Sequence, residues 1–82
     1  MKKITINLGF NEDACLPDPE KYEVGDIFEL ISESSFFRVQ AKTKFCSEEE
    51  NSIFSIISDT CLAEFVVCEN TEGEKAWELI PL

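Results

Sequence analysis

The chain has 82 residues, a length that suits one domain and excludes a multidomain enzyme. Its hydrophobic content of 44% is enough for one small core and too high for a disordered tail. Seventeen acids, seven bases and no histidine give a net charge of −10, which argues against a protein that grips nucleic acid through its phosphates. We therefore treat residues 1–82 as a single domain.

The first predicted element is a strand over residues 3–8. Isoleucine and leucine alternate there with polar residues, and a period of two is typical of a half-buried strand. Residues 9–23 follow with no clear period, and Pro17 and Pro19 exclude a helix and disfavour a central strand. We expect this second segment to be a loop.

Two strands with a polar break between them come next. A turn at 24–26 leads into a strand over 27–31, and the polar residues 32–35 separate it from the longest strand candidate, 36–45. Alternation predicts the inward-facing set of that candidate: Phe37, Val39, Ala41, Thr43 and Phe45. We expect the two strands to pair as a β-hairpin, because the break has an ordinary loop length.

The strongest helix signal begins at Ser47. Ser47 and Glu50 fit a capping box, and acids in a first turn suit the helix dipole. The apolar residues of 53–57 then fall at helical spacing, so the pattern predicts a helix from Glu48 to about Ser58. Because β-branched isoleucine is a poor helix former, a strand is the alternative for this segment.

Residues 62–68 and 76–80 predict a second hairpin. The first run is rich in Val and Phe, Trp77 and Leu79 share a face of the second, and Gly73 lies in the polar turn at 69–75. This element order indicates an α+β domain: a small, strongly bent antiparallel sheet of about five strands, covered on one face by the helix. A small open β-barrel is the alternative, since five short strands can curl.

The sequence offers little for catalysis. The absence of histidine removes the commonest general base and excludes Ser-His and Cys-His nucleophile pairs. Three glycines, at 9, 25 and 73, are too far apart for a phosphate-binding loop. We predict a protein that is not an enzyme, with no catalytic residue and no cofactor.

The cysteines at 15, 46, 61 and 68 form no C-x-x-C pair, and zinc sites usually contain such short ligand pairs. We therefore predict no metal site. The beginning of the chain lacks the apolar run of a signal peptide, and no run is long enough to cross a membrane. These features predict a cytoplasmic protein with four reduced thiols and no membrane contact.

Negative charge is concentrated in residues 47–82, which carry nine acids and one base, a net charge of −8. The candidate partner-binding acids come from the predicted helix start and the hairpin turn: Glu48, Glu49, Glu50, Glu69, Glu72 and Glu74. If these two groups converge, they form a negative surface that complements a basic partner protein and repels nucleic acid. A solvated face that serves only solubility is the alternative.

Phe36 is a further candidate partner-binding residue, because it falls on the polar face of its strand. Three basic residues share that face: Arg38, Lys42 and Lys44. We interpret these bases as balancing acids on neighbouring strands, such as Glu29 or Glu64, and not as a nucleic-acid site. The exposed aromatic and the dense apolar run at 53–57 support an alternative function, a hydrophobic interaction module that forms a homodimer or joins a larger assembly.

No stretch of the chain carries the motif of one family. In size and charge it is similar to the small acidic inhibitors made by phages, including anti-CRISPR proteins. This similarity is one of type; it implies an inhibitor that imitates nucleic acid, and it transfers no residue assignments. The sequence thus predicts a small acidic binding or inhibitor domain whose partner is a protein with a basic surface, of the kind that binds nucleic acid.

Overall fold

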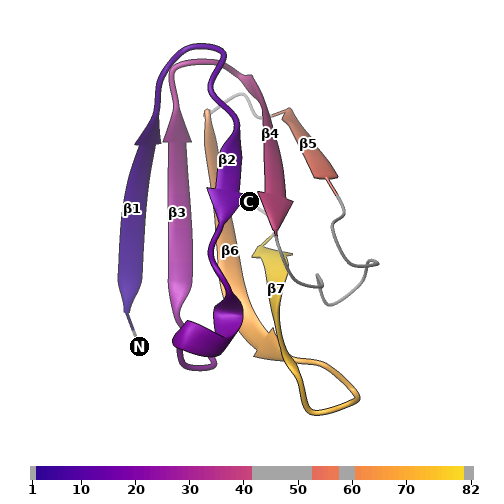
Figure 1. Ribbon diagram of the computed structural model, residues 1–82. Coiled ribbons are helices and arrows are strands. Elements are labelled where there is room, and N and C mark those ends of the chain that lie inside the picture. Colours follow the sequence, from indigo (N-terminus) through magenta and orange to yellow (C-terminus); the bar gives the residue numbers. More distant parts are fainter. Residues whose placement is uncertain (1, 42–52, 58–60, 81–82) are drawn as a thin grey trace.

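The computed structural model describes residues 2–41, 53–57 and 61–80, which form two β-sheets packed face to face (Figure 1). The four-stranded sheet has the order β1-β3-β6-β7, with bounds β1 Lys3–Leu8, β3 Ile27–Ser32, β6 Leu62–Glu69 and β7 Lys75–Ile80. The three-stranded sheet has the order β2-β4-β5, with bounds β2 Ala14–Leu16, β4 Phe36–Ala41 and β5 Ile53–Ile57. Within these described ranges the helical content is one 3-10 turn, η1 (Pro19–Lys21).

The strand pairing is mixed. β1 pairs with β3 and β2 pairs with β4 in parallel, whereas the other neighbours are antiparallel. The parallel pairs arise because the chain passes from one sheet to the other after β1, returns before β3, and crosses again after β3. The expectation of a purely antiparallel sheet is therefore wrong.

The predicted α+β class is wrong, because the described part of the segment expected to be helical is strand β5. Its backbone pairs antiparallel with β4, from Gln40 opposite Ile53 to Phe36 opposite Ile57. Three of its five residues are β-branched isoleucines, which favour a strand once a neighbouring strand supplies the hydrogen bonds. The rest of the predicted helix, residues 48–52 and 58, lies outside the described residues. The strands form two separate sheets, neither of them closed, and not one curled sheet, so the alternative of a small open barrel is wrong as well.

The first predicted hairpin is also wrong, whereas the second is confirmed. β3 lies between β1 and β6, and β4 lies between β2 and β5, so these consecutive strands belong to different sheets. Side-chain hydroxyls shape the crossing between them: Ser32 Oγ accepts from the Ser34 amide at 3.0 Å, and Ser34 Oγ accepts from the Phe36 amide at 3.2 Å. β6 and β7 do pair antiparallel across the predicted turn.

The segment expected to be a loop contains β2, which is only three residues long and too short to show a period. Its residues Ala14 and Leu16 are buried. In β4 the inward positions Phe37 and Val39 are buried as predicted, at 2% and 0% exposure. The other end of the predicted strand, residues 42–45, lies outside the described residues.

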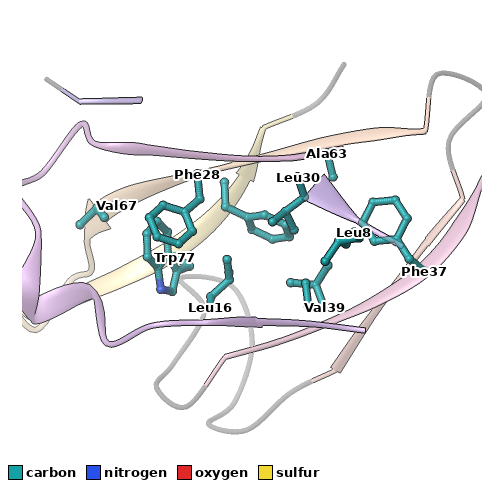
Figure 2. Packing of buried hydrophobic residues seen from close by; sticks show 11 residues of the cluster. Leu8, Leu16, Phe28, Leu30, Phe37, Val39, Ala63, Val67 and Trp77 are labelled. Atoms are coloured by element: carbon teal, nitrogen blue, oxygen red, sulfur yellow. The ribbon is translucent and has the colours of Figure 1, made fainter. Parts of the chain in front are cut away.

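The core lies between the two sheets, and both contribute side chains to it (Figure 2). The four-stranded sheet supplies Leu8, Phe28, Leu30, Ala63, Phe65, Val67 and Trp77, and the three-stranded sheet supplies Ala14, Leu16, Phe37 and Val39. Burying a large apolar side chain stabilises the fold by roughly 1.5–3 kcal/mol. Alternation along β1, β2, β3, β4 and β6 places these residues inward and leaves their neighbours on the outer faces, whereas β7 buries the adjacent residues Ala76 and Trp77.

Candidate functional site

The acids of the predicted hairpin turn lie on a well-ordered turn between β6 and β7. The Asn70 amide donates to the Glu74 carbonyl at 2.8 Å, and Asn70 Oδ1 accepts from the Glu72 and Glu74 amides, each at 2.9 Å. Gly73 has a φ of 79°, a left-handed conformation that glycine adopts without strain. The turn therefore holds the backbone of Glu72 and Glu74 in one conformation.

A second acidic segment surrounds η1. Asp18 caps this short helical turn, since its Oδ1 accepts from the Glu20 amide at 3.0 Å, and the following Pro19 is buried. Tyr22 attaches the segment to the core through an edge contact with Phe28, with ring centroids 5.3 Å apart. Local capping and aromatic packing thus determine where the acids of 18–23 lie.

Lys75 joins the two acidic segments, although 53 positions separate it from Tyr22. Its Nζ donates to the Tyr22 carbonyl at 2.7 Å, and its amide donates to Glu20 Oε1 at 3.4 Å. Figure 1 shows η1 and the β6–β7 turn at the same end of the molecule. We name this region the acidic end, and it comprises Asp18, Glu20, Glu23, Glu69, Glu72 and Glu74.

The acidic end is strongly negative. Its two segments, 18–23 and 69–75, hold six acids and two bases, Lys21 and Lys75, for a net charge of −4. Five of the six acids are exposed, and Asp18 is half-buried. Because the Lys75 ammonium already binds a backbone carbonyl, its charge is directed inward, toward the contact between the segments.

Some of the predicted site residues lie in the part of the chain that the structure describes, and others lie outside it. Glu69, Glu72 and Glu74 lie together in the hairpin turn, and η1 adds Glu20 beside them. Glu48, Glu49 and Glu50 lie outside the described residues. Sequence reasoning missed the acids of 18–23, because tertiary contacts, among them those of Lys75, bring this proline-rich loop to the hairpin.

Phe36 does not belong to the acidic end. It opens β4, at the end of the molecule opposite the β6–β7 turn (Figure 1), and it is 52% exposed. Together with Asn11, Asp13 and Arg38 it lines a pocket of about 260 Å³.

The predicted charge partners of the basic stripe are wrong for Arg38. Its guanidinium pairs with Asp13, from Nη2 to Oδ2 at 2.7 Å, because β2 and β4 are neighbours. Glu29 and Glu64 instead bind Lys3. Lys42 and Lys44 lie outside the described residues.

The cysteines differ from the expectation of four reduced thiols. Cys15 and Cys61 are free, whereas Cys68 is disulfide-bonded. Among the residues that the structure describes, no three His, Cys, Asp or Glu side chains form a group able to hold a metal ion. The same part of the chain contains no helix long and apolar enough to cross a membrane.

Comparisons with known proteins find no match to this chain among family models, curated proteins or solved structures.

Proposed function

We propose that this domain is a non-enzymatic binding protein that presents its acidic end to a basic surface of a partner protein. The contact of Lys75 with Glu20 and Tyr22 carries the proposal, because it holds two acidic segments together at one end of the fold. The acids there are displayed on a capped helical turn and a hydrogen-bonded hairpin turn, which reduces the entropy lost on binding.

The charge of the whole chain supports the same function. A net charge of −10 attracts a positively charged surface over a distance of about 10 Å at 0.1 M salt, and it accelerates encounter. The same field repels nucleic acid, so we propose no direct contact with DNA or RNA. Association should depend steeply on ionic strength.

The partner we propose is a nucleic-acid-binding protein. Its groove gathers lysine and arginine to hold phosphates, and clustered carboxylates on a compact domain can occupy that groove in their place. Binding of this kind would inhibit the partner by competition. The size and charge that the chain shares with small phage inhibitors are consistent with such a role.

Capture experiments with two charge-reversal variants test this function. Glu69→Lys places a cation on the acidic end, and Glu33→Lys makes the same change in charge at an exposed position between β3 and β4. We expect wild type and Glu33→Lys to capture the same basic protein from host lysate at low salt, and Glu69→Lys to lose it. If both variants lose capture of the partner equally, the acidic end acts only through the net charge of the chain and is not the binding site. Capture that persists at high salt would also contradict the proposal.

A hydrophobic module that forms a homodimer is the second candidate, favoured by the exposed aromatics Phe10 and Phe36, at 68% and 52%. Light scattering across a wide concentration range decides between the two functions. A dimer that Phe36→Ser dissociates supports the second candidate, and a monomer at all concentrations excludes it.

We further propose that the domain acts in the cytoplasm. Disulfides are rare in that compartment, so this location requires the Cys68 disulfide to be open in the cell. The number of thiols that react in intact cells tests this location.

A further inference from the structure

The outer face of the four-stranded sheet is rich in aliphatic side chains. Ile31 lies opposite Leu62 and Ile27 lies opposite Val66 on β3 and β6, and Ile80 lies beside them on β7. Ile31 is 38% exposed, and the other four are partly exposed. We name these five residues the aliphatic frame.

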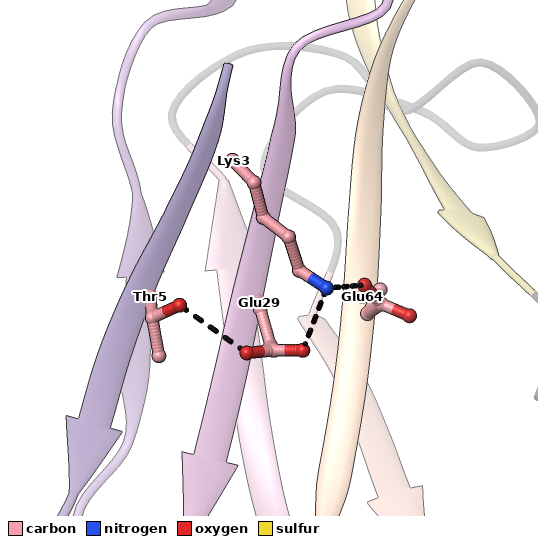
Figure 3. A network of polar contacts seen from close by, with 4 residues as sticks. All are labelled: Lys3, Thr5, Glu29 and Glu64. Atoms are coloured by element: carbon pink, nitrogen blue, oxygen red, sulfur yellow. Dashed lines mark hydrogen bonds and ion pairs between the residues drawn. The ribbon is translucent and has the colours of Figure 1, made fainter.

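Two carboxylates lie inside this frame. Glu29 and Glu64 are directly opposite each other on β3 and β6, between the two aliphatic pairs, and each side chain is only 18% exposed. Figure 3 shows Lys3 reaching from β1 to both: its Nζ lies 3.1 Å from Glu29 Oε2 and 3.2 Å from Glu64 Oε2. Thr5 Oγ1 donates to the remaining oxygen of Glu29 at 3.2 Å.

Lys3 neutralises only part of the negative charge of Glu29 and Glu64 and fills only part of their capacity to accept hydrogen bonds. One ammonium balances one of the two negative charges, and Glu78 adds a further exposed carboxylate on the same face. Glu64 Oε1 accepts no hydrogen bond from any residue that the structure describes. The Glu64 side chain is only 18% exposed, and a donor from outside the chain would satisfy the oxygen that lacks a protein donor.

We propose that this face docks a partner segment in which aliphatic side chains flank an arginine or lysine whose cation binds Glu64. The inference rests on the proposed function in one respect, that the partner is a basic protein. It adds to the acidic end a second contact surface, which is partly apolar. Aliphatic side chains of the partner would cover the frame, and its cation would complete the charge balance that Lys3 begins.

Charge complementarity selects this occupant over a second copy of the chain. Face-to-face packing of two identical sheets would bring two carboxylate pairs, each bridged by a single lysine, into one desolvated interface. Like charges buried together oppose association. A cationic segment removes that penalty.

A peptide titration tests the proposal directly. The probe is the strand-forming peptide acetyl-Leu-Arg-Leu-Arg-Leu-amide, added to the whole domain with labelled Ile, Leu and Val methyl groups and followed by NMR. We expect chemical-shift changes centred on Ile31, Leu62 and Val66. Replacing arginine by neutral citrulline, or leucine by serine, should weaken binding about tenfold or more, because each removes one of the two recognised features.

Two variants locate the site. Glu64→Gln keeps the shape of the side chain and should weaken peptide binding about tenfold, and the surface variant Ile31→Ser should weaken it independently. Glu33→Gln, at an exposed position between β3 and β4 that belongs to neither the acidic end nor the aliphatic frame, is the matched control and should change binding less than about twofold. Circular dichroism confirms that each variant is folded, and the Ile31 variant keeps the test decisive if Glu64→Gln unfolds.

Three results would overturn the inference: no binding of the probe, methyl shifts confined to other surfaces, or equal affinity for wild type and both site variants. A dimer whose dilution shifts the same methyl groups would assign the face to a second copy instead. Failure of the proposed function is separate. Capture of a basic protein that Glu69→Lys leaves intact and Glu64→Gln abolishes would overturn the acidic end as the binding site while supporting this face.

Discussion

The indole of Trp77 on β7 donates from Nε1 to the Pro17 carbonyl at 2.8 Å. Trp77 is fully buried and also contacts the rings of Phe28 and Tyr22, with centroids 5.1 and 6.1 Å away. One side chain therefore connects the end of β2 and the approach to η1 with the four-stranded sheet. The position of the acidic end depends on this connection as well as on Lys75.

Trp77→Phe should destabilise the domain by roughly 2–4 kcal/mol, since it leaves the Pro17 carbonyl without its donor and opens space in the core. Urea unfolding followed by circular dichroism measures the loss. Leu79→Ala on the same strand is the control, and it should cost less because Leu79 is already 37% exposed. A loss below about 0.5 kcal/mol for Trp77→Phe would refute the structural role of this hydrogen bond.

Acid should weaken the fold through Asp26. Its carboxylate accepts from the Lys2 amide at 2.9 Å and the Glu23 amide at 3.0 Å, and these two bonds hold the pKa of Asp26 below its ordinary value of 3.8. Because the folded pKa is lowered, the stabilisation is present above pH 3.8 and is lost as pH falls through the folded value.

Asp26→Asn tests this dependence, because the amide cannot ionise. Urea unfolding of both proteins from neutral to acidic pH should show wild type more stable at neutral pH, with the difference shrinking in strong acid. A difference that stays constant with pH would show that the charge of Asp26 contributes nothing.

Lys3 should produce the opposite dependence at high pH. Its contacts with Glu29 and then Glu64 raise the pKa of its ammonium above 10.5. The stabilisation is therefore complete below pH 10.5 and is lost as pH rises through the higher folded value. Lys3→Met keeps much of the apolar stem and should remove this alkaline loss in thermal unfolding. Identical alkaline profiles for Lys3→Met and wild type would contradict the assignment.

The hairpin turn should depend on the oxygen of Asn70. Asn70→Ala removes the acceptor for the Glu72 and Glu74 amides, and we expect a loss of about 1 kcal/mol and weaker binding to a basic partner. Asn70→Asp keeps an acceptor oxygen and should retain most of both properties. If Asn70→Asp loses as much stability as Asn70→Ala, the side-chain acceptor is not what orders the turn.

Thiol titration should distinguish the cysteines. Oxidised protein, once unfolded without reductant, should react at two thiols, Cys15 and Cys61, whereas reduced protein should react at all four. Blocking thiols in intact cells before lysis extends the assay to the proposed location. Four reactive thiols in cells fit the cytoplasm, and two would contradict that location.

Several features of this protein follow from its sequence alone, because they depend on local chemistry. Alternation at 3–8 and the Val- and Phe-rich run at 62–68 predict strands, and Gly73 between two apolar runs predicts the hairpin that β6 and β7 form. The negative charge of the hairpin turn is likewise a local property, since Glu69, Glu72 and Glu74 are close together in the chain. Periodicity also predicts the burial of Phe37 and Val39.

Only the tertiary structure decided which strands became neighbours and which acids came together. Ile53–Ile57 is compatible with both helical and strand spacing, and pairing with β4 selects the strand. β3 and β4 are consecutive yet separate, because burying the apolar faces of both against one core requires the chain to cross between sheets. The convergence of Glu20 with Lys75, and of Lys3 with Glu29 and Glu64, arises in the same way. A pattern along the chain specifies which side of a strand is apolar, but the packing of the complete core determines what lies beside it.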